Sequence, residues 1–87
     1  MIRYVYPAVF IKDEAEDVYR VFFPDLDITT DGNIMEEAFL YAEECLKTYF
    51  KYIEKYDLDF NLPTDFEIVK KSARAEDVVM LIEAVTK

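Results

Sequence analysis

Apolar side chains occupy both alternating faces of the segment from Arg3 to Ile11. Such a run predicts a strand that is covered on both sides, because a face in contact with water would carry polar residues at every second position. Pro7 has no backbone N–H, so we expect this strand to lie at an edge of the sheet or to bulge there. The charged stretch from Lys12 to Asp17 predicts a hairpin connection to the next strand.

Two further strands are predicted by the pattern that follows. The segment from Val18 to Phe23 alternates, and Arg20 interrupts only one of its faces. Pro24 ends this strand, and the β-branched residues between Asp27 and Thr30 predict a short third strand. The first half of the chain is therefore expected to form a three-stranded antiparallel meander. The apolar face of its second strand is formed by Tyr19, Val21 and Phe23.

A long helix is predicted to begin after Asn33 and to end near Tyr56. Asn33 and Glu36 have the spacing of a capping box, with Asn in place of Ser or Thr. Apolar residues recur at helical spacing over roughly half of the circumference, which is more than contact with one sheet requires. The predicted apolar face comprises Ile34, Ala38, Tyr41, Ala42, Cys45, Tyr49, Tyr52, Ile53 and Tyr56, and it is widened by Met35, Phe39, Leu46 and Phe50.

The remaining segments complete the expected fold. A loop from Asp57 to Thr64 is followed by a short helix that ends at Lys71 and is capped by Thr64 or Asp65. The segment from Val78 to Val85 is apolar on both faces and predicts a final strand. The predicted order is therefore β-β-β-α-α-β, an α+β fold in one domain covering residues 1–87, with the long helix packed on one sheet face.

The apolar content of the chain exceeds what one helix on one sheet can cover. Of the 87 residues 53% are apolar, and exposed apolar surface of this kind usually marks association. We therefore expect the chain to associate with other chains. The alternative is a monomer in which the segment from Asp57 to Lys71 acts as a lid over the sheet.

The charge balance is strongly acidic. Ten lysines and arginines stand against 19 aspartates and glutamates, which gives a formal net charge of -9. This charge opposes binding to a phosphate backbone, so direct DNA binding is not expected. It favours a basic protein partner, whose approach a negative surface accelerates. The alternative is that acidity serves only solubility.

Few residue types suited to catalysis are present. The chain has no histidine, which is the commonest general acid or base and the commonest metal ligand. Its single glycine excludes a glycine-rich phosphate loop, and no cofactor is expected. Five carboxylates between the second strand and the helix start remain, and turn and helix-end roles are favoured over a two-metal nuclease site. They are Asp25, Asp27, Asp31, Glu36 and Glu37.

Cysteine usage and hydropathy indicate the compartment. Cys45 is the only cysteine, so no intrachain disulfide forms, and a buried reduced thiol is expected. No basic-then-apolar leader opens the chain, and no apolar run approaches the length of a membrane span. These features predict a cytoplasmic protein without membrane contact.

Several pieces of the chain, taken in order, resemble the HicB family of small antitoxins. The similarity runs over nearly the whole chain, although each piece alone is weakly specific. Members usually have Pro-Gly-Cys after the Phe-Pro-Asp-Leu motif, whereas Asp27-Ile28 follows here. Many also carry a C-terminal DNA-binding segment, which is not expected in this chain. The pieces are Tyr6-Pro7-Ala8-Val9-Phe10, Tyr19-Arg20-Val21-Phe22-Phe23-Pro24-Asp25-Leu26, Thr30, Gly32, Glu36-Glu37-Ala38 and Ala42-Glu43-Glu44-Cys45-Leu46.

The resemblance implies both a fold and a function. The fold would be a partial ribonuclease H-like domain without the active site of that enzyme. The chain would be a homodimer or homotetramer, because members of the family associate in this way, which agrees with the surplus apolar surface. The function would be to bind and neutralise a small basic HicA-like toxin that cleaves mRNA with a histidine, and the five carboxylates above would meet its lysines or arginines. A metal-dependent nuclease on a ribonuclease H-like scaffold and a stand-alone scaffold or regulatory protein are the alternatives.

Overall fold

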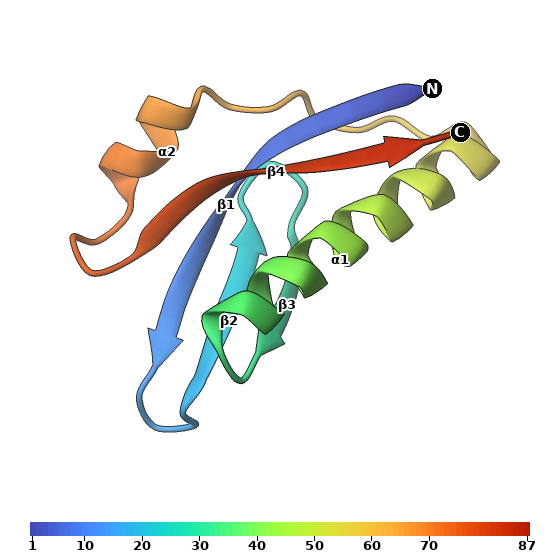
Figure 1. Ribbon diagram of the computed structural model, residues 1–87. Helices are drawn as coiled ribbons and strands as arrows, with labels where there is room; N and C mark the ends of the chain where they lie inside the picture. Colours follow the sequence, from blue (N-terminus) through green and yellow to red (C-terminus); the bar gives the residue numbers. More distant parts are fainter.

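The computed structural model describes residues 1–87 and contains four strands and two helices in the predicted order (Figure 1). The α+β fold expected from the sequence is therefore confirmed. Neither helix combines the length and the apolar character needed to cross a membrane. The elements are β1 (Ile2–Asp13), β2 (Val18–Phe23), β3 (Ile28–Gly32), α1 (Met35–Tyr56), α2 (Phe66–Ser72) and β4 (Val78–Thr86).

The four strands form one antiparallel sheet in the order β3-β2-β1-β4. The expectation that the first strand is an edge strand is wrong, because β1 lies between β2 and β4. Its register with β4 also runs from Ile2 to Phe10 without a bulge. β2 pairs with β1 only from Val9 onward, so at Pro7 the strand pairs with β4 alone.

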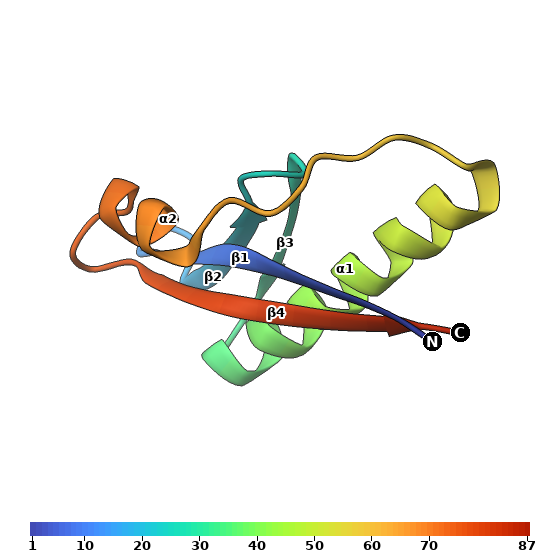
Figure 2. The same cartoon turned by 90° about the horizontal axis from the view of Figure 1, so that it is seen from above.

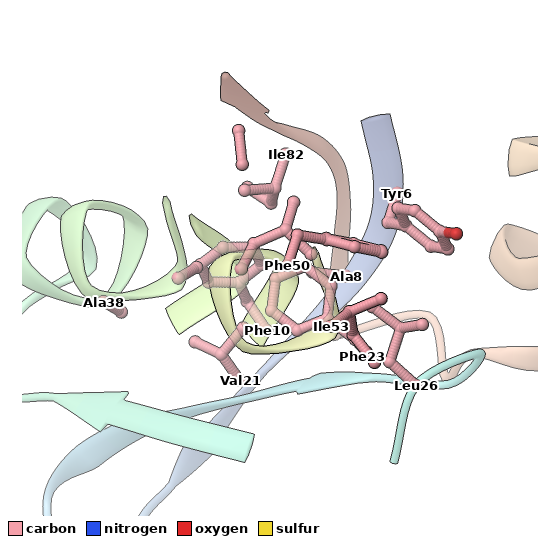
Figure 3. Close-up of a cluster of buried hydrophobic side chains, with 13 residues drawn as sticks. Tyr6, Ala8, Phe10, Val21, Phe23, Leu26, Ala38, Phe50, Ile53 and Ile82 are labelled. Atoms are coloured by element: carbon pink, nitrogen blue, oxygen red, sulfur yellow. The ribbon is translucent and has the colours of Figure 1, made fainter. Parts of the chain in front are cut away.

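One face of the sheet packs against α1 and forms the main core (Figure 3). Ala8 and Phe10 of β1 and Ile82 of β4 are almost fully buried in this layer. The ring of Tyr4 stacks on Phe50 of α1 with 3.8 Å between centroids and 5° between planes. The core cluster comprises Tyr6, Ala8, Phe10, Val21, Phe23, Leu26, Ala38, Ala42, Leu46, Phe50, Ile53, Ile82 and Ala84.

The buried face of α1 differs from the predicted one. Its centre is the line of Ala38, Ala42, Leu46, Phe50 and Ile53, all of which are buried. The alanines let the helix backbone approach the sheet, while the bulky core residues fill the space nearer the C-terminal end. Of the four tyrosines on the predicted face, Tyr49 is half-buried against the core, while the other three lie on the flank, where their hydroxyl groups are easily solvated. Tyr41, Tyr52 and Tyr56 are all exposed.

The capping of α1 differs from the prediction, whereas the capping of α2 confirms it. The capping residue of α1 is Ile34, which makes no side-chain capping bond, so the predicted Asn33–Glu36 box is wrong. Instead the backbone N–H of Asn33 donates to Oε1 of Glu37 at 3.0 Å. This bond resembles the one that the glutamate of a capping box accepts, but the acceptor is Glu37 rather than the predicted Glu36. Asp65 caps α2 by accepting from the N–H of Glu67 at 2.9 Å, as expected.

The second face of the sheet is covered by α2, which lies on the opposite side of β1 and β4 from α1 (Figures 1 and 2). Val9 of β1 and Val69 of α2 are both buried there and border one hollow. Cover on both sides of β1 is therefore confirmed. The cover is incomplete, because Leu81 of β4 is still exposed.

Candidate functional site

The turn after β2 is tied to the segment that connects the two helices. The carboxylate of Asp25 accepts hydrogen bonds from the backbone N–H of Thr64 at 2.9 Å and from the Thr64 hydroxyl. The carbonyl oxygen of Asp25 accepts from the side-chain amide of Asn61 at 2.9 Å. Asp25 therefore fixes this segment, residues 57–65, which we call the strap.

Two further contacts hold the strap against the core. The Tyr6 hydroxyl donates to the carbonyl oxygen of Asn61 at 2.6 Å. Burial first, and then the nearby charge of Asp25, raises the pKa of Tyr6 above its ordinary value, so the hydroxyl keeps the proton that it donates. The ring of Phe60 meets Phe50 edge to face with 5.0 Å between centroids. The strap thus crosses from the end of α1 to α2 in a fixed course (Figure 2).

The structure brings two of the five predicted carboxylates together. Asp25 and Asp27 lie on the β2–β3 turn, and with Asp59 of the strap they line a hollow of about 320 Å³. Asp27 is exposed and adopts a left-handed backbone conformation with φ of 55°. Leu26, Phe60 and Tyr49 also border the hollow, and no lysine or arginine does. The result is a small, uncompensated acidic depression with apolar walls.

The other three predicted carboxylates lie elsewhere. Asp31 on β3 forms an ion pair with Arg20 at 3.1 Å. The carboxylate of Glu37 in the first turn of α1 accepts a hydrogen bond from the backbone N–H of Asn33 at 3.0 Å. Glu36 beside it is exposed and favours the positive end of the helix dipole. The five residues therefore do not form one site.

The carboxylates do not converge in the way that a two-metal nuclease requires. No group of three or more His, Cys, Asp or Glu side chains lies close enough to hold a metal ion. Asp25 and Asp31, two of the candidates, are already engaged by Thr64 and Arg20. The geometry gives the nuclease alternative no support.

Cys45 is half-buried on α1 rather than fully buried. Its Sγ lies 3.9 Å from the carbonyl oxygen of Thr29 on β3, at the limit of a weak thiol hydrogen bond. Burial raises the pKa of the Cys45 thiol, which disfavours the reactive thiolate.

The strap also contains exposed apolar and acidic residues, for which the sequence pattern predicts only a loop. Leu62 is 78% exposed and Leu58 is 43% exposed, although both are large and apolar. The flanking acids Asp57 and Asp59 are exposed as well. The sequence signal that could have identified them is the alternation of acidic and apolar residues in Asp57-Leu58-Asp59-Phe60, a stretch without lysine or arginine.

No family model and no curated protein sequence matches the chain. Among solved structures, a chain of a toxin–antitoxin complex from Streptococcus pneumoniae matches it with a TM-score of 0.82. The match covers 97% of this chain and 70% of the other chain, at 18% sequence identity. A likeness at this identity concerns the fold. The chain therefore shares its fold with a component of a toxin–antitoxin complex.

Proposed function

We propose that this chain is a HicB-like antitoxin, which binds and neutralises a small basic HicA-like toxin that cleaves mRNA. The observation that carries the proposal is the fold shared with a chain of the toxin–antitoxin complex from Streptococcus pneumoniae over 97% of this chain. That complex contains two kinds of protein, and residue content favours the antitoxin for this chain. This chain has no histidine with which to cleave RNA, and its net negative charge opposes RNA binding.

The fold explains why two residues of the family motifs, Gly32 and Asp25, are needed. Gly32 lies against the first turn of α1, where a side chain would meet the backbone of Ala38. Asp25 of the Phe-Pro-Asp-Leu motif anchors the strap through Thr64. Both residues thus specify the fold, and this supports reading the motif pieces as one family pattern.

The surface charge fits a basic partner. Only six of the 19 carboxylate side chains take part in ion pairs within the chain. The remaining negative charge is free to accelerate the approach of a basic protein and to pair with its lysines and arginines. Among the predicted partner-binding residues, Asp27 and Glu36 are exposed and free of ion pairs.

Self-association is part of the same proposal. Exposed apolar side chains lie on the flank of α1 and on the edge strand β4. Large exposed apolar side chains at a free strand edge favour pairing with a second chain. We propose that the protein acts as a homodimer or homotetramer. The residues concerned include Tyr41, Tyr52, Val78 and Leu81.

Co-expression with the product of the adjacent reading frame tests the function. We expect that product to be a basic protein of roughly 60–90 residues with a lone histidine, as RNA-binding proteins are basic. Expressed alone it should arrest growth, and co-expression of this chain should restore growth and yield a co-purifying complex. A histidine-to-alanine variant of the partner controls for toxicity unrelated to cleavage. A folded, abundant chain that neither restores growth nor co-purifies would overturn the proposal.

A further inference from the structure

The strap presents apolar side chains to solvent at a place where the fold gives them no internal role. Leu62 is 78% exposed, more than any other large apolar residue except Met1, and Leu58 is 43% exposed. Ile68 in α2, just beyond the strap, is 59% exposed. Large apolar side chains that are exposed within one short segment are candidates for a contact surface.

This surface is held in place before any partner arrives. Thr64 is fixed by Asp25, Asn61 is fixed by Tyr6 and Asp25, and Phe60 packs on Phe50. These anchors alternate with the exposed leucines along the strap. A segment ordered in advance loses less conformational entropy on binding, so its contacts contribute more fully to affinity.

The charge around these leucines has one sign. Between Asp57 and Val69 the chain has four carboxylates and no lysine or arginine. None of the four carboxylates takes part in an ion pair. The adjacent hollow of about 320 Å³ adds the side chains of Asp25 and Asp27. An occupant of this surface must therefore be apolar at its centre and basic at its rim.

We propose that the strap is the docking surface for the basic protein partner, with Leu58 and Leu62 as its apolar anchors and Asp57 and Asp59 facing the partner's lysines or arginines. This assignment rests on the proposed function and adds to it the surface that performs it. A second copy of this chain is the less suitable occupant, because two straps would bring like charges together.

Paired variants of the purified chain test the assignment, with the adjacent-frame protein as the probe and the dissociation constant measured across a range of salt concentrations. We expect Leu62→Ser to weaken binding by about tenfold or more, as loss of a central apolar anchor does. The matched control is Leu40→Ser on α1, a leucine that is 55% exposed and lies outside the strap, which should leave binding nearly unchanged.

The charge contribution has its own pair of variants. Asp57→Asn with Asp59→Asn should weaken binding about two- to fivefold per carboxylate at low salt and should flatten the salt dependence. Glu14→Gln with Glu16→Gln, which removes the same charge from the exposed β1–β2 turn, should change neither. Circular dichroism and thermal melting show that each variant is folded.

The outcomes separate the two proposals. If the wild-type chain binds and the strap variants bind equally well, the docking surface is wrong and the proposed function stands. If the wild-type chain does not bind the adjacent-frame protein, both proposals are overturned. If Leu62→Ser leaves partner binding unchanged but reduces self-association in light scattering, the strap is a contact between copies and the assignment to a basic partner is wrong.

Discussion

Asp25 and Thr64, 39 positions apart in the chain, are joined by two hydrogen bonds to one carboxylate. The first residue lies in the turn after β2, and the second lies near the end of the strap. Their contact determines where the strap crosses the molecule and therefore which of its side chains face solvent. A local turn residue in the sequence is thus a tertiary anchor in the fold.

Removal of the anchor should release the strap. We expect Asp25→Ala to lower the free energy of unfolding by about 1–3 kcal/mol, because the N–H and hydroxyl of Thr64 lose a charged acceptor. Limited proteolysis should then cut the strap faster than in the wild type. Asp59→Ala, which removes an exposed carboxylate that makes no hydrogen bond, is the matched control and should leave cleavage slow. Equal proteolysis of the two variants would contradict this role for Asp25.

The only glycine should not tolerate a side chain. A Cβ at Gly32 would lie 2.5 Å from the backbone nitrogen of Ala38 and 2.8 Å from its Cα. We expect Gly32→Ala to lower the free energy of unfolding by about 1–3 kcal/mol, because either β3 or the first turn of α1 must shift. Urea denaturation measures the change. A variant as stable as the wild type would show that this helix end is free to move.

The corrected face of α1 can be tested with two leucines of the same helix. Leu46 is fully buried, so Leu46→Ala should lower the free energy of unfolding by about 2–5 kcal/mol. Leu40 is 55% exposed, so Leu40→Ala should change it by less than about 0.5 kcal/mol. Thermal and urea unfolding of both variants give the comparison. Similar losses for the two would mean that the helix is rotated from its described position.

Stability should fall at alkaline pH because of Tyr4. Its hydroxyl donates to Glu54 at 2.7 Å, and burial first, then this hydrogen bond, raises the pKa of Tyr4 to about 12 from 10.0. The raised pKa means that the folded state holds the proton more tightly than the unfolded state does. The stabilisation is therefore complete below pH 10 and is lost as the pH rises toward 12.

The variant Tyr4→Phe removes this titration and keeps the ring stacked on Phe50. Between pH 10 and 12 its melting temperature should fall less steeply than that of the wild type. Some dependence should remain, because the pKa of Tyr6 is also raised. Tyr52→Phe on the exposed flank of α1 is the control and should behave as the wild type does. Parallel pH curves for Tyr4→Phe and the wild type would rule out a contribution from this hydroxyl.

Much of the fold was predictable because it depends on local patterns. Alternation and Pro24 predicted β2 from Val18 to Phe23, and the structure has the same bounds. Helical spacing predicted an end near Tyr56, where α1 ends. The two apolar faces of β1 predicted cover on both sides, which α1 and α2 supply.

The remaining features depend on contacts that spacing does not encode. The apolar arc of α1 was too wide to show its centre, and close approach at Ala38 and Ala42 decided which line is buried. Pro7 predicted an edge strand, but β1 lies between β2 and β4, and at Pro7 it pairs with β4 alone. The strap is a loop, as predicted, but its fixed course could not be predicted, because its anchors Tyr6 and Asp25 are far away in sequence.

The most direct test of the central claim is a titration of RNA cleavage. The product of the adjacent reading frame is mixed with an mRNA substrate, and this chain is added in increasing amounts. If the chain is an antitoxin, cleavage should fall to background at near-equimolar amounts and recover in part at high salt, as the charged contacts are screened. Cleavage that continues at full rate in the presence of an excess of folded chain would contradict the claim.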